Sequence, residues 1–186
     1  MEKVHGGTTE SLGWALVASL ETFRGCSIKF ASKGSGFNGI SISKSGETRK
    51  IELKTVSRSD SWFAINGLTG IKKLFFDENY WLYFSLLPEN IVIIVKALPF
   101  FEKQVDYRTG KSLLEQLKVW IKQTERITAD FGLQFIPRIN FKVRVPIRQM
   151  LREILDNPKS NDWQRIAVSV WKLGGHGYWE KLYGDA

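Results

Sequence analysis

The chain has 186 residues, 43% of them hydrophobic and 13% aromatic, and its formal net charge is +8. This length and composition suit one compact domain with a real core and exclude a disordered chain. No apolar stretch approaches the roughly 20 residues that a membrane span needs. We expect no secretory signal, because no apolar run with a small-residue cleavage site follows Lys3. We therefore expect a cytoplasmic protein with no membrane partner. The single cysteine, Cys26, excludes an internal disulfide and a cysteine-rich zinc site.

Residues 1–105 have the pattern of an α/β core. In chain order they predict a helix over 8–24, a strand over 27–31, a hairpin over 34–56, a helix over 68–76, and two strands over 80–87 and 90–98. The first helix is expected to bury a stripe of Leu12, Leu16, Leu20 and Phe23. The last two strands are continuously apolar and therefore expected at the centre of the sheet.

Residues 106–186 form a C-terminal extension of different composition, which we expect to pack on the core. Its patterns predict an amphipathic helix over 111–126, an alternating strand over 139–145, and helices over 146–155 and 162–173. The order of elements predicts an α/β (α+β) fold, in which helices flank a mixed central sheet.

The hairpin carries the residues with the clearest chemistry. Alternation along the strand places Glu52 and Lys54 on one face, whereas Ile51 and Leu53 face the other way. A carboxylate helps to hold Mg²⁺ at a phosphodiester, and a lysine orients the attacking water or stabilises developing charge. The alternative is an ordinary charged strand face. One carboxylate seldom suffices, so a second acid from a neighbouring element is expected.

These residues resemble the PD-(D/E)XK nuclease superfamily, which includes restriction endonucleases and junction resolvases. Glu52-Leu53-Lys54 matches (D/E)-x-K, Glu10 matches the helix glutamate, and Ser35-Gly36-Phe37-Asn38 lies where Ser/Gly-x-Asp would stand. The resemblance covers roughly residues 8 to 97 and implies that residues 1–105 are a nuclease-like core. The extension, residues 106–186, is then expected to contribute to DNA binding or dimerisation. The resemblance also implies catalytic roles for Glu52, Lys54, Glu10 and position 38, a metal held by Glu52 and position 38, and Mg²⁺ as cofactor with Mn²⁺ as a substitute.

Asn38 departs from the family pattern, because a neutral amide binds Mg²⁺ far more weakly than a carboxylate. Three explanations are open: an engineered Asp-to-Asn replacement, a family acid supplied by Glu10 or Asp60 instead, or a natural member that binds without cleaving. If Ser45-Gly46 forms a two-residue turn, Ile40 pairs with Ile51 and Asn38 falls on the apolar face. A bulge would then be needed to bring Asn38 toward Glu52.

Basic residues concentrate between positions 24 and 58, a distribution that favours nucleic acid as the partner. The candidate contacts are Lys29, Lys33, Ser35, Arg58, Trp62, Arg138, Lys142 and Arg144. The last three lie on one face of an alternating strand, which is also the pattern of a charged, edge-protecting strand. The two C-terminal helices form a candidate helix-turn-helix, with Gln164 and Arg165 at the start of the recognition helix.

The pattern as a whole predicts a Mg²⁺-dependent endodeoxyribonuclease, a small restriction-type enzyme that works as a homodimer on DNA. Two alternatives stay open. One is a Holliday-junction resolvase or homing endonuclease of the same fold, and the other is a non-catalytic nucleic-acid-binding module on a degenerate nuclease scaffold.

Overall fold

The computed structural model describes residues 8–31, 38–57, 62–65, 78–103, 112–131, 141–144 and 146–184. The elements are α1 (Thr8–Phe23), β1 (Ser27–Phe30), β2 (Gly39–Ile42), β3 (Thr48–Val56), β4 (Trp62–Ile65), β5 (Tyr80–Leu86), β6 (Ile91–Lys96), α3 (Ala97–Lys103), α4 (Leu113–Phe131), β7 (Phe141–Arg144), α5 (Ile147–Asp156), α6 (Asn161–Arg165), β8 (Ser169–Leu173) and β9 (Trp179–Tyr183). The helix expected over 68–76 lies outside the described residues.

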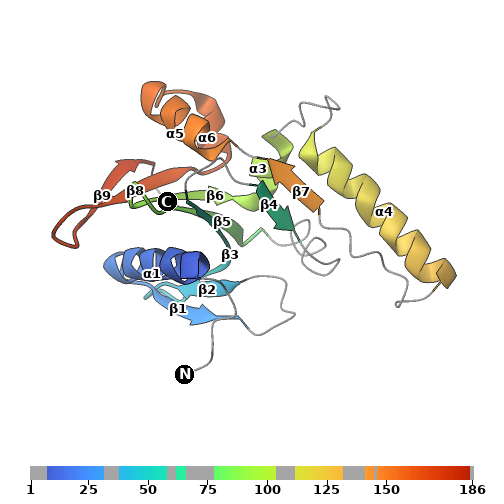
Figure 1. Ribbon diagram of the computed structural model, residues 1–186, viewed down its shortest axis with the longest axis horizontal. Helices are drawn as coiled ribbons and strands as arrows, with labels where there is room; N and C mark the ends of the chain where they lie inside the picture. The colour runs from blue at the N-terminus through green and yellow to red at the C-terminus, as the bar shows by residue number, and fades with distance from the viewer. Residues whose placement is uncertain are drawn as a thin grey trace.

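A seven-stranded mixed sheet organises the protein, with strand order β1-β2-β3-β5-β6-β8-β9 (Figure 1). The β3–β5 pair is parallel, and every other neighbouring pair in this sheet is antiparallel. Strands β4 and β7 form a separate two-stranded ribbon. The structure confirms the expected class, a mixed α/β fold with helices flanking the sheet. Within the described part of the chain, no helix is long and apolar enough to cross a membrane.

The two faces of the sheet bury different helices. On one face, α1 packs Val17 and Leu20 against Ile51 and Leu53 of β3. On the other face lie α3, α5 and α6, as Figure 1 shows above the sheet. Their side chains join those of β5 and β6 in the larger core cluster, which includes Leu82, Phe84, Ile93, Phe100, Ile147, Ile154 and Trp163. The central strands β5 and β6 are apolar on both faces because both faces are covered.

Gly13 lets α1 approach the sheet closely. A Cβ atom at this position would lie 2.0 Å from Thr55 Oγ1 on β3. The Ser85 hydroxyl of β5 donates a hydrogen bond to the Gly13 carbonyl at 3.1 Å. The backbone of α1 therefore rests directly on β3 and β5, which no residue with a side chain would allow without displacement.

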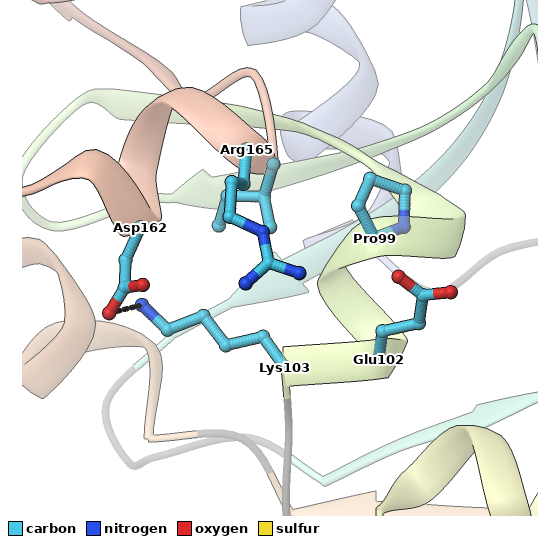
Figure 2. Close-up of a pocket in the computed structure, with 6 residues that line it drawn as sticks. Pro99, Glu102, Lys103, Asp162 and Arg165 are labelled. Atoms are coloured by element: carbon cyan, nitrogen blue, oxygen red, sulfur yellow. Dashed lines mark ion pairs between the residues drawn. The ribbon is translucent and has the colours of Figure 1, made fainter.

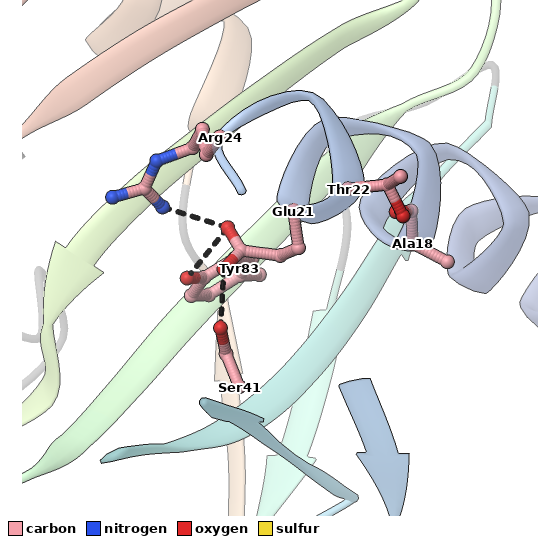
Figure 3. Close-up of polar contacts among 6 residues, drawn as sticks. All are labelled: Ala18, Glu21, Thr22, Arg24, Ser41 and Tyr83. Carbon is pink, nitrogen blue, oxygen red and sulfur yellow. Dashed lines mark hydrogen bonds and ion pairs between the residues drawn. The ribbon is translucent and has the colours of Figure 1, made fainter. Parts of the chain in front are cut away.

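Glu21, near the end of α1, is fully buried and joins the helix to the sheet (Figure 3). Its carboxylate accepts hydrogen bonds from Arg24 Nη1 at 2.7 Å, from the Tyr83 hydroxyl at 3.1 Å, and from the Ser41 hydroxyl. Burial raises the pKa of the Tyr83 phenol, and the adjacent Glu21 carboxylate raises it further. The phenol is therefore protonated at neutral pH and can donate its hydrogen bond to Glu21. Three donors from α1, β2 and β5 thus compensate the cost of burying one carboxylate.

The apolar stripe expected on α1 was partly wrong. Leu16 and Leu20 are buried, but Leu12 is 54% exposed and Phe23 is 43% exposed. The buried face instead includes Trp14, Val17 and Glu21. The buried face of α1 was misplaced because it was inferred from apolar residues alone, whereas the helix also buries the charged and paired Glu21.

The helix expected over 162–173 was also wrong in its second half. Helix α6 ends at Arg165, Ala167 adopts φ +50°, and the chain continues as β8. Strand β8 pairs with β6, so the C-terminal segment completes the main sheet. A helix of five residues followed by a strand cannot form the helix-turn-helix considered for Gln164 and Arg165. Val168 and Val170 are β-branched and favour a strand, and β8 forms hydrogen bonds with the otherwise open edge of β6. This pairing outweighs the helical spacing of the apolar residues in the segment.

Arg148 of α5 contacts the chain at the ends of both β3 and β5. Its guanidinium contacts Glu89 in the β5–β6 turn, with Nε 2.6 Å from Oε1, and also donates to the Ser57 carbonyl just after β3. The hydrogen bond from Arg148 lowers the pKa of Glu89. This contact fixes α5 at the carboxyl end of β3.

We expect Glu21→Ala to destabilise the protein by about 3–5 kcal/mol, because Arg24 loses its buried counter-charge and two hydroxyls lose an acceptor. Urea denaturation would measure this loss. Glu180→Ala, which removes an exposed glutamate from β9, should change stability by less than about 0.5 kcal/mol. Equal losses in the two variants would contradict the role of Glu21.

We also expect Glu89→Gln to cost about 0.5–1 kcal/mol at pH 7, the range of a partly exposed ion pair. Because the folded-state pKa of Glu89 is lowered, its contribution is present above the ordinary pKa of about 4.3 and is lost as the pH falls through the folded value. The stability difference between parent and variant should therefore shrink in acid. Denaturation at several pH values would reveal a pH-independent difference if this account were wrong.

Candidate functional site

The hairpin of β2 and β3 differs in register from the sequence expectation. Ser43 and Glu47 close a three-residue loop, with Ser43 N–H bonded to Glu47 O at 2.9 Å and Gly46 at φ +83°. Gly46 supplies the left-handed residue that such loops require. Consequently Ile40 pairs with Lys50 and Gly39 with Ile51, so the pairing of Ile40 with Ile51 expected from a two-residue turn was wrong. The whole of β2 is shifted by one residue relative to β3.

Asn38, just before β2, is bonded to both neighbours of Glu52. Its N–H donates to Ile51 O at 2.8 Å, and its side-chain Oδ1 accepts the Leu53 N–H at 2.9 Å. The side chain thus replaces a backbone carbonyl at the point where the regular ladder ends. Position 38 lies beside the Ile51–Leu53 segment, as a second site residue must.

Glu52 and Lys54 form an ion pair on β3. Lys54 Nζ lies 3.0 Å from Glu52 Oε1, and the two side chains are 19% and 18% exposed. Ile51 and Leu53 are buried against α1, which confirms that Glu52 and Lys54 share the opposite face. Their neighbours across the parallel pair are the apolar Leu82 and Phe84 of β5. Partial burial of the two side chains lowers the local dielectric and so strengthens the attraction between their charges.

Glu10 lies in the first turn of α1, which covers the face opposite to Glu52 and Lys54. The structure therefore does not place Glu10 on the face that carries the pair. An acid in the first turn of a helix also interacts favourably with the helix dipole, which accounts for its position without a catalytic role.

The expected nucleic-acid contacts are spread over several elements. Lys29 is exposed on the edge strand β1. Trp62 of β4 and Arg144 of β7 are directly opposite in the two-stranded ribbon, and Lys142 stands opposite Ala64. Lys33, Ser35, Arg58 and Arg138 lie outside the described residues, as does Asp60. The ribbon thus brings together Trp62 and Arg144, which are 82 positions apart in the chain.

Part of the basic cluster between residues 24 and 58 has structural partners. Arg24 pairs with Glu21, and Lys54 pairs with Glu52. The Arg49 guanidinium lies 4.2 Å from the centre of the Trp81 ring. These contacts reduce the number of cations that the cluster presents to a phosphate backbone.

The residues at the site fit a magnesium ion poorly as they stand. Mg²⁺ is usually held by one or two carboxylates together with water and substrate phosphates. Glu52 supplies one carboxylate, which already contacts Lys54, and the Asn38 oxygen accepts a backbone hydrogen bond. Within the described ranges, no group of three or more His, Cys, Asp or Glu side chains is arranged to hold a metal.

A small pocket between α3 and α6 is not a second candidate site (Figure 2). It is lined by Pro99, Glu102, Lys103, Asp162, Arg165 and Ile166. Lys103 Nζ lies 3.5 Å from Asp162 Oδ2 and 3.6 Å from the centre of the Trp163 ring. Both contacts stabilise the packing of α6 against α3. The volume of about 100 Å³ is below the 300–1,000 Å³ of typical ligand pockets.

A scan of the sequence against protein-family models found no match, and neither did a search of curated proteins. Function must therefore be inferred from the arrangement around Glu52.

The sequence did not predict the buried contacts of Glu21. The only sequence signal for Glu21 was its i, i+3 spacing from Arg24, which is common on helix surfaces. Ser41 and Tyr83 are too distant in the chain to be recognised as its partners.

Proposed function

We propose that this protein is an endonuclease-type phosphodiester hydrolase that acts on DNA, in which Glu52 and Lys54 form the reactive pair and Asn38 keeps Mg²⁺-dependent cleavage weak. The observation that carries the proposal is the position of Asn38, which is hydrogen-bonded on both sides of Glu52. This position supports the proposal because it matches the place of the first acid in the PD-(D/E)XK pattern expected from the sequence.

The pair suits a phosphodiester through two complementary roles. The Lys54 ammonium lies 3.0 Å from the Glu52 carboxylate. At this distance Lys54 can contact a phosphoryl oxygen while Glu52 accepts a proton from water. Because both side chains are largely buried, their positions are fixed before a substrate arrives.

Position 38 explains why weak activity and an intact scaffold can coexist. Asn and Asp have the same shape, so the Oδ1 that accepts the Leu53 N–H would be retained by an aspartate. The second oxygen of that aspartate would replace an amide nitrogen, which is a hydrogen-bond donor and cannot bind a cation. A single atom thus separates the present site from one with two carboxylates.

A second candidate function is DNA binding without cleavage. It is favoured by the same contacts, because Glu52 is neutralised by Lys54 and the Asn38 oxygen is occupied. Both candidates predict affinity for DNA, but only the first predicts that a single carboxylate restores cleavage. Double-strand scission by a chain with one such site would further require a homodimer.

We expect Asn38→Asp to raise Mg²⁺-dependent cleavage of plasmid and branched DNA by at least about tenfold, since it adds a metal-binding anion beside Glu52. The change should leave the fold intact, because the bond to Leu53 is kept. Cleavage is measured with purified parent and variant at equal concentrations. Comparing linear, supercoiled and four-way substrates would also separate a restriction-type enzyme from a junction resolvase.

Matched variants make the result specific to the site. Asn90→Asp makes the same chemical change in the β5–β6 turn and should have no effect. Adding Glu52→Gln or Lys54→Ala to Asn38→Asp should abolish the gain. If Asn38→Asp is folded, binds DNA and is no more active than the parent, the protein is a binding module and the first proposal is wrong.

The β4–β7 ribbon gives a separate expectation for DNA affinity. If Lys142 and Arg144 each neutralise one phosphate, replacing both with Ala should lower the slope of log K against log salt by about 2, equally for all sequences. A salt titration monitored by anisotropy would measure the slope. Lys118→Ala/Lys159→Ala, an equal loss of charge at exposed positions outside the ribbon, serves as the control. Identical slopes for both double variants would exclude the ribbon as a phosphate-contacting element.

A further inference from the structure

Three aromatic side chains gather at the C-terminal end of α1 and form a continuous surface, here called the aromatic platform: Phe23, Trp171 and Tyr178. Phe23 meets Trp171 edge to face at 6.3 Å between ring centroids and meets Tyr178 at 5.3 Å. The rings come from α1, from β8 and from the β8–β9 turn, so only the folded sheet brings them together. Figure 1 shows this end of α1 beneath the β8–β9 hairpin.

The outer rings of the platform are unusually accessible for aromatic side chains. Tyr178 is 68% exposed and Phe23 is 43% exposed, while Trp171 is half-buried beneath them against the α1 core cluster. Tyr178 follows Gly177, at φ +75°, in a turn whose glycines leave space around it. Core packing explains Trp171, but it does not explain why a tyrosine stands over Phe23 on the solvent side.

Cations lie next to the platform. The Arg24 guanidinium carbon lies 5.9 Å from the centre of the Trp171 ring, and Lys181 Nζ lies 5.5 Å from it. Lys181 is exposed on the β8–β9 hairpin and pairs with Trp171, so it lies on the platform's face of the sheet. The next cross-strand pair, Lys172 and Glu180, faces the other side because side chains alternate along a strand. Arg24 is neutralised by Glu21, so Lys181 provides the positive charge of this surface.

Exposed aromatic rings beside cations suit one kind of partner particularly well. Unpaired bases stack on aromatic side chains without regard to sequence, while neighbouring cations contact the phosphates. Paired bases in a duplex are stacked on each other and offer no free face. An acidic protein surface would match the cations, but it would leave the aromatic faces without stacking partners.

We propose that the aromatic platform binds single-stranded nucleic acid, with an unpaired base stacked on Tyr178 and a phosphate near Lys181. The platform lies on the α1 face of the sheet, opposite to Glu52 and Lys54, and is separated from β3 by β5 and β6. It is therefore a second contact, and it does not depend on whether Glu52 and Lys54 hydrolyse DNA.

The test measures binding of fluorescein-labelled oligo(dT) and of a duplex of equal length to the full chain, with a chelator present to prevent cleavage. Tyr178→Ala should weaken oligo(dT) binding by about 5- to 100-fold, the range expected for one lost base stack. Tyr178→Phe keeps the ring and should bind within about twofold of the parent. Duplex affinity should change by less than about twofold in both variants.

Two controls separate the platform from general surface effects. Phe30→Ala removes an aromatic ring that is 57% exposed on β1 and should leave oligo(dT) affinity unchanged. Lys181→Ala should weaken oligo(dT) binding more than Lys159→Ala, an equal loss of charge on an exposed loop. Circular dichroism and gel filtration show whether each variant is folded and of the parental size.

Three results would overturn the inference. The first is no measurable affinity of the parent for oligo(dT) at low salt. The second is an equal effect of Tyr178→Ala and Phe30→Ala. The third is a change of oligomeric state in Tyr178→Ala with oligo(dT) affinity intact, which would assign the platform to contact with a second copy of the chain.

Discussion

A buried carboxylate needs hydrogen-bond donors for both of its oxygens, and Glu21 is bonded to donors from three parts of the chain. Arg24 comes from the end of α1, Ser41 from β2 and Tyr83 from β5. These bonds set the rotation of α1 on the sheet, because only one face of the helix directs position 21 inward. Gly13, two turns earlier, allows the helix to lie directly on β3 and β5. Directional bonds at one end and close backbone contact at the other hold α1 in a single orientation.

The docking of α1 also determines which face of β3 is free to act chemically. Ile51 and Leu53 are used by the α1 core, so Glu52 and Lys54 must face the other side. The three-residue loop of the hairpin then sets the position of Asn38 along β3. The candidate site is therefore a product of packing on the far side of the sheet and of one turn, both remote from the reactive groups.

Much of the architecture was predictable from sequence, and the errors have physical causes. The apolar strands β5 and β6, the helix α1 and the (D/E)-x-K strand β3 were recognised because their patterns are local. The register of β2 was missed because Ser45-Gly46 fits both two- and three-residue loops, and only the bond from Ser43 to Glu47 distinguishes them. Strand β8 was missed because the edge of β6 that recruits it lies far away in the chain. The sequence pattern consequently places Trp171 in a helix and does not predict its contacts with Phe23 and the neighbouring cations.

The pairing of β8 with β6 affects how the newly synthesised chain folds. Strand β6 consists of Ile91-Val92-Ile93-Ile94-Val95-Lys96, and its outer hydrogen-bonding edge is completed by a segment that is synthesised more than 70 residues later. Until that segment arrives, the most apolar strand of the sheet has an open edge, which is the arrangement that promotes association between chains. The C-terminal hairpin therefore acts as a closing strand pair, and the solubility of any shortened form of the protein depends on where the chain is cut relative to Ser169.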